Sequence, residues 1–514
     1  MRKSIKSAGL FAALLVYPVI GCTDLTEVPT SAITPDNFYK NESEIIGGLA
    51  SVYNTMQQVI QNPYHLSEVS TDEIIVPTRG VNWADGGKWL DLHHHTFTAN
   101  SPGMLDNGNG AYEQLFMGVA RANTVLAATK DINYASKTVV TAELRALRAY
   151  YYFLIQDLFG GVPIVEDIAV MPRARNTRAE VFKFIETELL AARPGLPSKP
   201  WPAEMNGRLT QGAVDAILAS LYLNAEVFSG TVTATGLTKG PARWADAIAR
   251  CDMILGSGNY TLSANWKDNF VWDNYKSTEI IMAAKMTEAT GLGLDFLNRT
   301  LHYNQYTPGG WNGFSALTET YNAFSTNDIR RQIFLAGPQY NVETGARITQ
   351  TDGSTPLDFD PNIVDDKAAP ENAGARIYKW PNDPAHVERY NGNDYATFRL
   401  GEIYLIKAEA MNELGQTANA IALVNSTTRA RAFPTVPNPI SPTLSQSAFR
   451  DALLQERLFE LMAEGKRRQD RIRMGRYNEA WGKFKPVSPA YKILFPIPQP
   501  QMDNNPLLVQ NAGY

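Results

Sequence analysis

The segment Leu147–Pro163, LRAYYYFLIQDLFGGVP, carries the strongest local signal in the chain. Across the wider range 141–159, apolar side chains recur at intervals of three and four residues: Leu144, Leu147, Tyr151, Leu154, Ile155 and Leu158. This spacing predicts an amphipathic helix with one buried face. Gly160-Gly161 and Pro163 predict where that helix ends.

The same periodicity recurs along most of the 514 residues. It predicts further helices at 44–60, 112–129, 178–192, 211–228, 244–255, 402–414, 417–432 and 448–464. Strand-like segments are short, for example 279–283 and 492–496. Helix pairs joined by short turns, without repeated strand–helix alternation, predict an all-α fold and not a parallel-sheet enzyme.

Two predicted helices, 402–414 and 417–432, follow each other with a spacing typical of tetratricopeptide repeats. Ala408 lies on the first and Ala420 on the second, with Gly415 at the turn. Small residues mark the points where the helices of such repeats approach closely. The spacing therefore predicts tetratricopeptide-like helix pairs, although any antiparallel helix pair would give a similar pattern.

The rest of the chain is rich in loops. The segment 337–374 is polar and rich in Asp, Thr, Gly and Pro, and long excursions of this kind are usually functional or disordered. No clear linker divides the sequence. We therefore expect one helical body over 43–514, with 265–400 contributing most of a loop-rich part.

The N-terminus has the pattern of a targeting segment. Basic residues within the first six positions precede an apolar stretch at 8–16, which is too short to span a bilayer. The pattern ends on Gly21-Cys22, and a small residue directly before a cysteine resembles a bacterial lipobox. We predict a lipoprotein signal peptide at 1–21, acylation of Cys22 and a lipidated tether at 22–42. An ordinary secretory signal with an incidental cysteine is the alternative.

Composition limits the classes of partner. The chain has 47 basic and 52 acidic residues, for a formal charge of -5, which argues against a nucleic-acid binder. Hydrophobic residues at 44% supply a large core and argue against disorder, fibres and multi-span membrane proteins. If Cys22 is acylated, Cys251 has no partner for an internal disulfide. It stands in an apolar helical pattern, so we expect it to be buried and not a nucleophile.

The sequence contains no complete catalytic motif. GxxxxGK[ST], HExxH and GxSxG are all absent. His93-His94-His95 is the only metal-like cluster, and in an extended segment the three side chains would not face one ion. We expect no enzyme activity, no cofactor and no metal site. A glycoside hydrolase remains an alternative, because a sequence does not give the separation of two carboxylates.

A dense run of alternating charge occupies 455–471. Leu453, Leu454, Leu458, Leu461 and Met462 form one apolar helix face within and before it. We therefore interpret the charged residues as a salt-bridge network around that face and not as a catalytic cluster.

Aromatic residues in two polar, glycine-rich loops are the strongest functional signal. The loops are 79–89 and 301–313. An indole or phenol ring can cover the apolar face of a sugar while amides bond its hydroxyl groups. The candidate binding residues are Asn82, Trp83, Trp89, Tyr303, Tyr306, Trp311 and Asn312. The alternative for each aromatic residue is that it caps the hydrophobic core from a loop.

Four segments carry a resemblance to a known family. They are 147–163, the helix at 404–410, the residues Glu456-Arg457 to Gly465, and the chain end at 494–514 with LFPIP, NP and QNAGY. On these motifs the chain resembles the SusD/RagB family of outer-membrane nutrient-binding lipoproteins. One departure is Arg468-Gln469, where the family usually has an aromatic pair.

The resemblance implies an all-α scaffold with four tetratricopeptide-like units and a loop-rich, ligand-facing subdomain. It implies a lipid-anchored protein on the cell exterior that delivers oligosaccharides to a SusC-like TonB-dependent transporter barrel in the outer membrane. Trp83 and Trp89 match the early aromatic loop of glycan-binding members, and Tyr303 with Trp311 resembles their later platform. On this interpretation the tryptophans stack on sugars, while Tyr303, Tyr306 and nearby amides orient the hydroxyls. Peptide capture on the same scaffold is the alternative.

Overall fold

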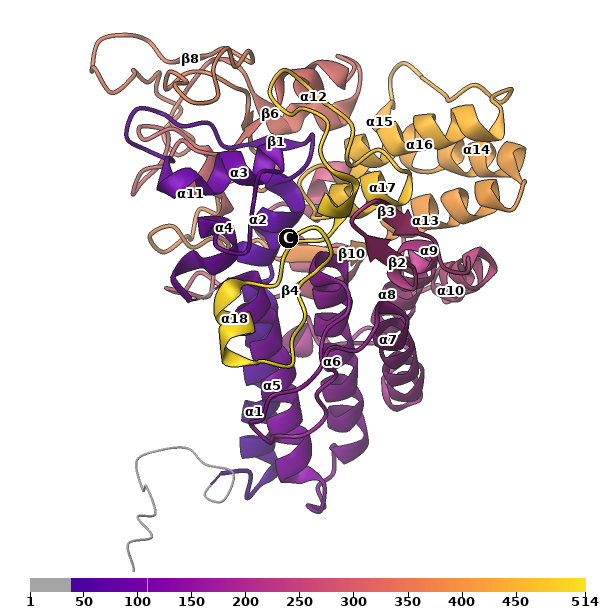
Figure 1. Ribbon diagram of the computed structural model, residues 1–514. Helices are drawn as coiled ribbons and strands as arrows, with labels where there is room; N and C mark the ends of the chain where they lie inside the picture. Colours follow the sequence, from indigo (N-terminus) through magenta and orange to yellow (C-terminus); the bar gives the residue numbers. More distant parts are fainter. Residues whose placement is uncertain (1–37, 109) are drawn as a thin grey trace, which may run out of the picture. The chain divides into compact units, whose positions relative to one another are not determined.

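The computed structural model describes residues 38–108 and 110–514 (Figure 1). The predicted signal peptide 1–21, the acylation site Cys22 and most of the tether 22–42 lie outside the described residues. Tyr39–Tyr514 form a single unit by internal contacts.

Helices predominate in the described residues. The α-helices are α1 (Glu42–Gln58), α2 (Asn62–Val69), α3 (Lys88–His94), α4 (Pro102–Leu105), α5 (Ala111–Thr129), α6 (Lys137–Phe159), α7 (Arg178–Ala192), α8 (Gln211–Leu223), α9 (Ala225–Phe228), α10 (Trp244–Gly256), α11 (Phe296–Thr300), α12 (Thr318–Ala323), α13 (Leu400–Glu413), α14 (Thr417–Ser426), α15 (Thr428–Ala432), α16 (Gln446–Leu461), α17 (Arg467–Arg473) and α18 (Gln499–Asn504). The strands are β1 (Ile74–Ile75), β2 (Thr231–Thr233), β3 (Gly236–Thr238), β4 (Ile280–Ala284), β5 (Ser315–Ala316), β6 (Phe334–Leu335), β7 (Gly337–Pro338), β8 (Asp358–Phe359), β9 (Arg376–Ile377) and β10 (Tyr395–Arg399).

Helix α6 contains most of the segment Leu147–Pro163. It begins at Lys137, one turn before the predicted start, and ends at Phe159 as predicted. Gly160 follows with φ 79°, a backbone conformation that favours glycine. A Cβ there would lie 2.8 Å from a methyl carbon of Leu494, so the C-terminal segment also requires glycine at this position.

Two predicted helices are interrupted. The range 211–228 divides into α8 and α9 at Asn224, whose side-chain amide donates to the backbone oxygen of Ser220 at 2.9 Å and whose side-chain oxygen accepts from Arg473 at 2.8 Å. The range 417–432 divides into α14 and α15 at Thr427, whose hydroxyl donates to the backbone oxygen of Leu423. In both cases a polar side chain takes part in bonds that compete with continued helix.

The predicted strand at 492–496 is wrong. Ala490–Ile493 form a short 3₁₀ helix, and no strand includes the residues that follow it in the described chain. The backbone N–H of Phe495 donates to the oxygen of Leu158 at the end of α6, at 2.8 Å. The segment is extended because it covers a helix end and not because it belongs to a sheet. The prediction at 279–283 matches β4, which pairs antiparallel with β10.

Helices α1, α5 and α6 lie side by side (Figure 1). Gly118 on α5 allows the close approach, because a Cβ there would lie 2.5 Å from the ring of Tyr151 on α6. The Tyr151 hydroxyl then donates to the oxygen of Val52 on α1, at 2.6 Å. One buried tyrosine thus joins three helices.

A second group of helices follows later in the chain. Helix α13 packs against α10, α14 and α16. Its shared core with α14 and α16 consists of buried apolar side chains: Leu405, Ala408, Ala420, Ile421, Val424, Ile440, Phe449, Leu453 and Leu461. The predicted small residues Ala408 and Ala420 are therefore at the centre of a helix–helix contact.

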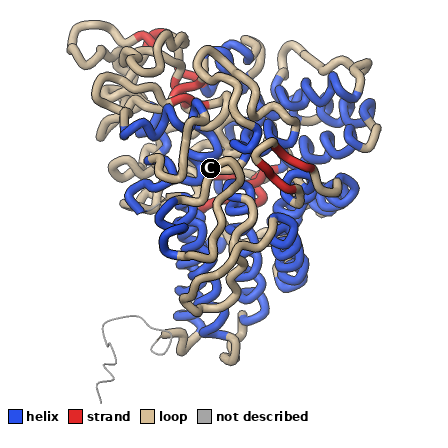
Figure 2. Tube along the Cα trace, in the orientation of Figure 1, coloured by secondary structure: helices blue, strands red, loops and turns tan. Residues whose placement is uncertain are grey.

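Loops dominate around the short strands (Figure 2). A four-stranded sheet has the order β1-β5-β9-β6, and β5 pairs antiparallel with both β1 and β9. Strand β1 leads into the predicted aromatic loop 79–89, while β5 follows the second predicted loop, 301–313. This sheet brings two loops together that are far apart in the sequence.

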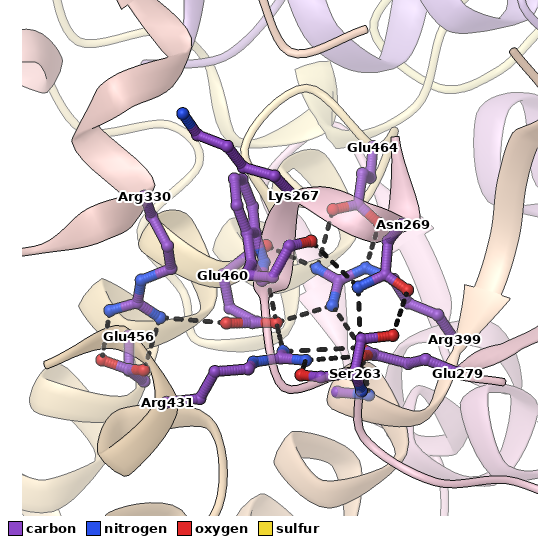
Figure 3. Close-up of polar contacts among 12 residues, drawn as sticks. Ser263, Lys267, Asn269, Glu279, Arg330, Arg399, Arg431, Glu456, Glu460 and Glu464 are labelled. Atoms are coloured by element: carbon purple, nitrogen blue, oxygen red, sulfur yellow. Dashed lines mark hydrogen bonds and ion pairs between the residues drawn. The ribbon is translucent and has the colours of Figure 1, made fainter. Parts of the chain in front are cut away.

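The charged run 455–471 forms the predicted salt-bridge network, but in the interior (Figure 3). Glu460 on α16 accepts from Arg330, Arg399 and Arg431, at 3.1, 2.6 and 2.5 Å. Arg399 also pairs with Glu464 at 2.8 Å. Burial disfavours the Glu460 carboxylate, yet the surrounding guanidinium groups outweigh it and lower the pKa of Glu460 to about 2.

The departure at Arg468 belongs to the same pattern. Arg468 is fully buried and donates to the Asp157 carboxylate on α6 at 2.9 Å. It also donates to the backbone oxygen of Ile493. A charged residue therefore joins α17 to the helix end on which the C-terminal segment packs.

Candidate functional site

Two loops meet through direct hydrogen bonds between the predicted aromatic residues. The indole N–H of Trp83 donates to the backbone oxygen of Trp311 at 2.6 Å. The neighbouring Asn82 amide donates to the Tyr303 hydroxyl at 2.9 Å. We call Trp83, Tyr303 and Trp311, with Asn82, the aromatic shelf.

The second loop is fixed from below by helix α11. The backbone N–H groups of Trp311, Asn312, Gly313 and Phe314 donate to the carbonyl oxygens of residues 298, 301, 299 and 299. Four successive amides thus bond to one short helix and its C-terminal neighbour. This arrangement holds the loop rigidly, as a binding surface requires.

Three non-glycine residues in these loops have a left-handed backbone. The φ angles are 63° at Trp83, 38° at Asp85 and 55° at Asn312. Asp and Asn adopt such angles readily, whereas a bulky residue such as Trp83 does so only where surrounding contacts impose the angle. Strain of this kind is concentrated at binding and catalytic sites, so the backbone of Trp83 supports a functional role for the first loop.

The shelf residues are accessible to solvent. Trp311 is 38% exposed, Trp83 and Tyr303 are half-buried, and Asn82 is exposed. Gly313 makes room for the first tryptophan, because a Cβ there would lie 2.3 Å from Cε2 of Trp83. The shelf therefore offers aromatic rings and amide groups to a ligand.

Trp89 supports the shelf from beneath and does not form part of its surface. It lies on α3, is 4% exposed, and packs edge-to-face against Trp83, His65 and Phe314 at centroid distances of 4.9 to 5.5 Å. Its indole N–H donates to the Asp85 carboxylate at 2.6 Å. A stacking role, as predicted from the sequence, does not fit a ring without an open face.

Tyr306 and Asn312 are also buried. Tyr306 packs with Leu297 and Leu301, and its hydroxyl donates to the backbone oxygen of Glu388 at 2.9 Å. Asn312 is fully buried, and its side-chain oxygen accepts two bonds from Arg376, at 2.6 and 3.0 Å. Neither side chain is placed to orient a ligand hydroxyl directly, so both act as supports of the loop.

Sequence reasoning did not identify Arg389. Its guanidinium carbon lies 5.6 Å from the Trp311 ring centroid, and Nη2 donates to the Tyr390 hydroxyl at 2.8 Å. The chain brings Arg389 to the shelf from a separate loop, and nothing in its local sequence marks it. Phe314, which lies beneath Trp83, could have been found from its position directly after the second aromatic loop.

The three consecutive histidines are on and after helix α3, not in an extended segment. His94 lies 2.6 Å from the Asp366 carboxylate, while His95 contacts Ser488 and the oxygen of Ser70, both at 2.9 Å. Burial lowers the pKa of His93 to about 3. Across 38–108 and 110–514, no three or more His, Cys, Asp or Glu residues are arranged to hold a metal ion.

Cys251 is buried on α10, as the sequence predicts. Burial raises the pKa of its thiol well above the usual value. This favours a packing role over nucleophilic chemistry.

A cavity of about 590 Å³ lies elsewhere, among α10, α13, α16 and α17. Its charged lining residues are already paired: Arg473 with Glu409, Arg450 with Glu413, and Lys239 with Glu226. Because these charged groups already bind one another, the cavity offers few free polar groups to a ligand. We therefore regard the shelf, with its exposed rings and strained first loop, as the candidate site.

In the part of the chain that the structure describes, no helix has both the length and the apolar character needed to cross a membrane.

Comparisons with known proteins agree with this architecture. A protein-family model described as "SusD family" matches residues 247–514. A second family model, described as "Starch-binding associating with outer membrane", matches residues 35–223. The "SusD-like protein P25" of Formosa agariphila is 25% identical, over 97% of this chain and 98% of its own. The "Starch-binding protein SusD" of Bacteroides thetaiotaomicron is 26% identical, over 78% of each chain.

Solved structures share the fold. A "Laminarin binding SusD-like protein" superposes with a TM-score of 0.72 at 22% identity, covering 93% of this chain and all of that one. The "Surface glycan-binding protein A" of Bacteroides thetaiotaomicron, in complex with laminarihexaose, gives 0.72 at 21% identity, covering 92% and 99%. The helix-rich fold is thus that of SusD-like structures.

Proposed function

The chain belongs to the SusD family, and from that premise we propose that it binds glycans on the cell surface without altering them. The aromatic shelf is the proposed binding surface. The observation that carries this proposal is the pair of hydrogen bonds, Trp83 to Trp311 and Asn82 to Tyr303, that assemble exposed rings from two loops.

The chemistry of the shelf suits a sugar. The exposed Trp311 ring can cover the C–H face of a pyranose, and the half-buried Tyr303 and Trp83 extend that surface. Asn82 adds an amide that can bond a hydroxyl. The names of the starch-binding and laminarin-binding relatives support the same class of ligand.

The proposal extends to anchoring and delivery. Acylation of Cys22, after removal of 1–21, would attach the protein to the outer membrane and leave the body outside the cell, with residues 22–42 as the tether. Several acyl chains give lasting attachment, since each buried methylene contributes about 0.8 kcal/mol. A SusC-like TonB-dependent transporter barrel would then receive the captured glycan.

The helical body is proposed to serve as the rigid support. Its packed helices, among them α13, α14 and α16, would form tetratricopeptide-like pairs, and the loop-rich part, mostly within 265–400, would face the ligand. The core contact around Ala408 and Ala420 supports this arrangement.

Calorimetry with a glycan panel tests the function. The purified protein, without its signal peptide, should bind at least one saccharide with a stoichiometry near one and generate no new reducing ends on long incubation. Peptide pools form a second arm of the panel. Binding of peptides but of no saccharide would replace the proposal by peptide capture, and saccharide turnover would replace it by an enzyme.

A further inference from the structure

Two arginine side chains lie together beneath the aromatic shelf. Arg79 follows β1, and Arg376 opens β9. Both donate to the Ser315 hydroxyl, at 3.1 and 2.9 Å, and both donate to the backbone oxygen of Ala373, at 2.8 and 2.7 Å. Because they share two acceptors, the two guanidinium groups are immediate neighbours.

The charge of this pair is not balanced by carboxylates. Arg79 is 4% exposed and Arg376 is fully buried, yet neither forms an ion pair with any residue of 38–108 or 110–514. The other acceptors of Arg376 are the Asn312 amide and the backbone oxygens of residues 371 and 374; Arg79 also bonds the oxygen of Pro370. Arg79 Nε has no hydrogen-bond partner there.

Other fully buried arginines of this chain are paired with carboxylates. Arg330 contacts three carboxylates, on Asp328, Glu456 and Glu460. Arg399 also contacts three, on Glu279, Glu464 and the shared Glu460. A buried charge without such partners is costly unless something else stabilises it. Burial lowers the pKa of Arg79 to about 10, and burial together with the neighbouring Arg79 lowers that of Arg376 well below its usual value.

The nearest acidic group does not neutralise the pair. The Glu371 carboxylate accepts from the backbone and the hydroxyl of Thr351, at 2.9 and 2.8 Å. It also lies 3.4 Å from Nε2 of His302. One carboxylate is thus near two guanidinium groups, and it forms its hydrogen bonds with Thr351 and not with either arginine.

The arginine pair is joined directly to the shelf. Arg376 holds the Asn312 side chain, the residue after Trp311. Arg79 exchanges two backbone hydrogen bonds with Asn82, at 3.0 Å each, and the Asn82 amide donates to Tyr303. The Tyr303 oxygen therefore accepts from Asn82, which leaves its own O–H to donate to a ligand.

Arg389 adds a third positive charge at the rim. It is half-buried over Trp311, bonds only the Tyr390 hydroxyl, and makes no ion pair with a described residue. Its Nε is buried and has no hydrogen-bond partner among the described residues. Donors of this kind suit oxyanions such as carboxylate and sulfate, which an arginine can bind through two parallel bonds.

We propose that the ligand of the aromatic shelf is an acidic saccharide, whose carboxylate or sulfate groups balance the charge of Arg79, Arg376 and Arg389. This inference rests on the function proposed above and narrows its ligand class. Arg389 and the Tyr303 hydroxyl contact the anionic group. Arg79 and Arg376, which lie below the surface, attract it through their field.

Matched saccharides test the proposal. The carboxylate arm compares polygalacturonate oligomers with the same oligomers after methyl esterification. The sulfate arm compares carrageenan oligomers with their desulfated forms. Laminarin is the neutral reference. At low ionic strength, at least one charged form should bind tenfold or more tightly than its neutral counterpart. The advantage should decrease as salt is added, because salt screens exposed charges.

Arg389→Gln should remove most of the difference between charged and neutral forms, while Arg476→Gln, at an exposed surface pair away from the shelf, should leave it intact. Which arm shows the advantage identifies carboxylate or sulfate as the source. Equal or tighter binding of the neutral forms would overturn the inference and leave glycan capture standing. Failure of every saccharide to bind would overturn both.

Discussion

The indole nitrogen of Trp83 lies 2.6 Å from the backbone oxygen of Trp311, although 228 residues separate the two along the chain. The bond joins a loop that follows β1 to a loop that precedes β5. Because the two strands pair in one sheet, the loops emerge next to each other. The proposed binding surface therefore depends on the sheet and not on either loop alone.

Replacing Trp83 by Phe should weaken ligand binding by about fivefold, since it removes one hydrogen bond, of about 1 kcal/mol, between the two loops. The melting temperature should change little, because a phenyl ring still packs at this half-buried position and the backbone is unchanged. Trp201→Phe is the matched control: its indole N–H also donates to a backbone oxygen, that of Leu209 at 2.9 Å, away from the shelf. Calorimetry measures the saccharide affinity of both variants. If Trp83→Phe binds as tightly as Trp201→Phe, the hydrogen bond between the two loops is not needed for binding.

Trp311→Ala should reduce affinity by about 2 kcal/mol or more, because an exposed aromatic ring that stacks on a ligand behaves as a hot spot. Trp272→Ala provides the comparison, since Trp272 is 43% exposed in a different loop. If the two variants bind the cognate saccharide equally well, the stacking surface lies elsewhere.

Gly313→Ala should disturb the shelf without changing any aromatic residue. The added Cβ would lie 2.3 Å from the Trp83 ring, so the ring must move away from Trp311. We expect at least a tenfold loss of affinity and an altered near-ultraviolet circular dichroism spectrum. Gly256→Ala, where a Cβ meets open space, should have neither effect. An unchanged affinity for Gly313→Ala would mean that the position of Trp83 is unimportant for binding.

Local pattern predicted most helices because their buried faces repeat along the sequence. The breaks at Asn224 and Thr427 escaped prediction, since each depends on a side-chain bond as well as on helix propensity. The segment 492–496 has the composition of a strand, but in the described structure it covers the end of α6 and accepts a hydrogen bond from Arg468 on α17.

The same limit applies to the site. The aromatic residues of both loops could be predicted because glycine and asparagine surround them. Whether a ring is exposed depends on what packs against it: Trp89 contacts His65, and Tyr306 packs with Leu297. Arg389 reaches Trp311 only through the tertiary fold, so no local pattern could indicate it.

Stability should decrease as pH rises from about 4.5 to 7, because of a buried carboxyl pair. Glu68 accepts from the backbone N–H of Gly465, and Glu73 from that of Ala463 at 2.8 Å. Burial raises the pKa of Glu68 to about 7, although the charge of Lys379 opposes this shift. Burial also raises the pKa of Glu73. In the unfolded chain the pKa of a glutamate is about 4.3. Between this pH and 7 the unfolded state therefore loses protons that the folded state keeps, so the free energy of unfolding decreases.

Glu68→Gln should therefore stabilise the protein at pH 8 by about 2 to 3 kcal/mol and leave it nearly unchanged at pH 4. Urea unfolding at pH 4, 6 and 8 measures the difference, with the exposed Glu204→Gln as the control. A Glu68→Gln variant that is less stable at pH 8 would mean that the carboxylate form is needed at that position.

Glu460→Gln should have the opposite effect at neutral pH. The carboxylate is shared by Arg330, Arg399 and Arg431, so its loss leaves buried positive charge unpaired and should cost about 3 to 5 kcal/mol. Because the pKa of Glu460 is lowered to about 2, this stabilisation is present above pH 4.3, the value in the unfolded chain, and is lost as pH falls towards 2. The wild-type protein should lose stability across that range, and the variant should lose less. Glu479→Gln, which breaks an exposed pair with Arg476, should cost less than about 1 kcal/mol by the same urea measurement. If Glu460→Gln proves as stable as Glu479→Gln at pH 7, the three arginines must find other partners, and the buried network does not hold α16 to the rest of the fold.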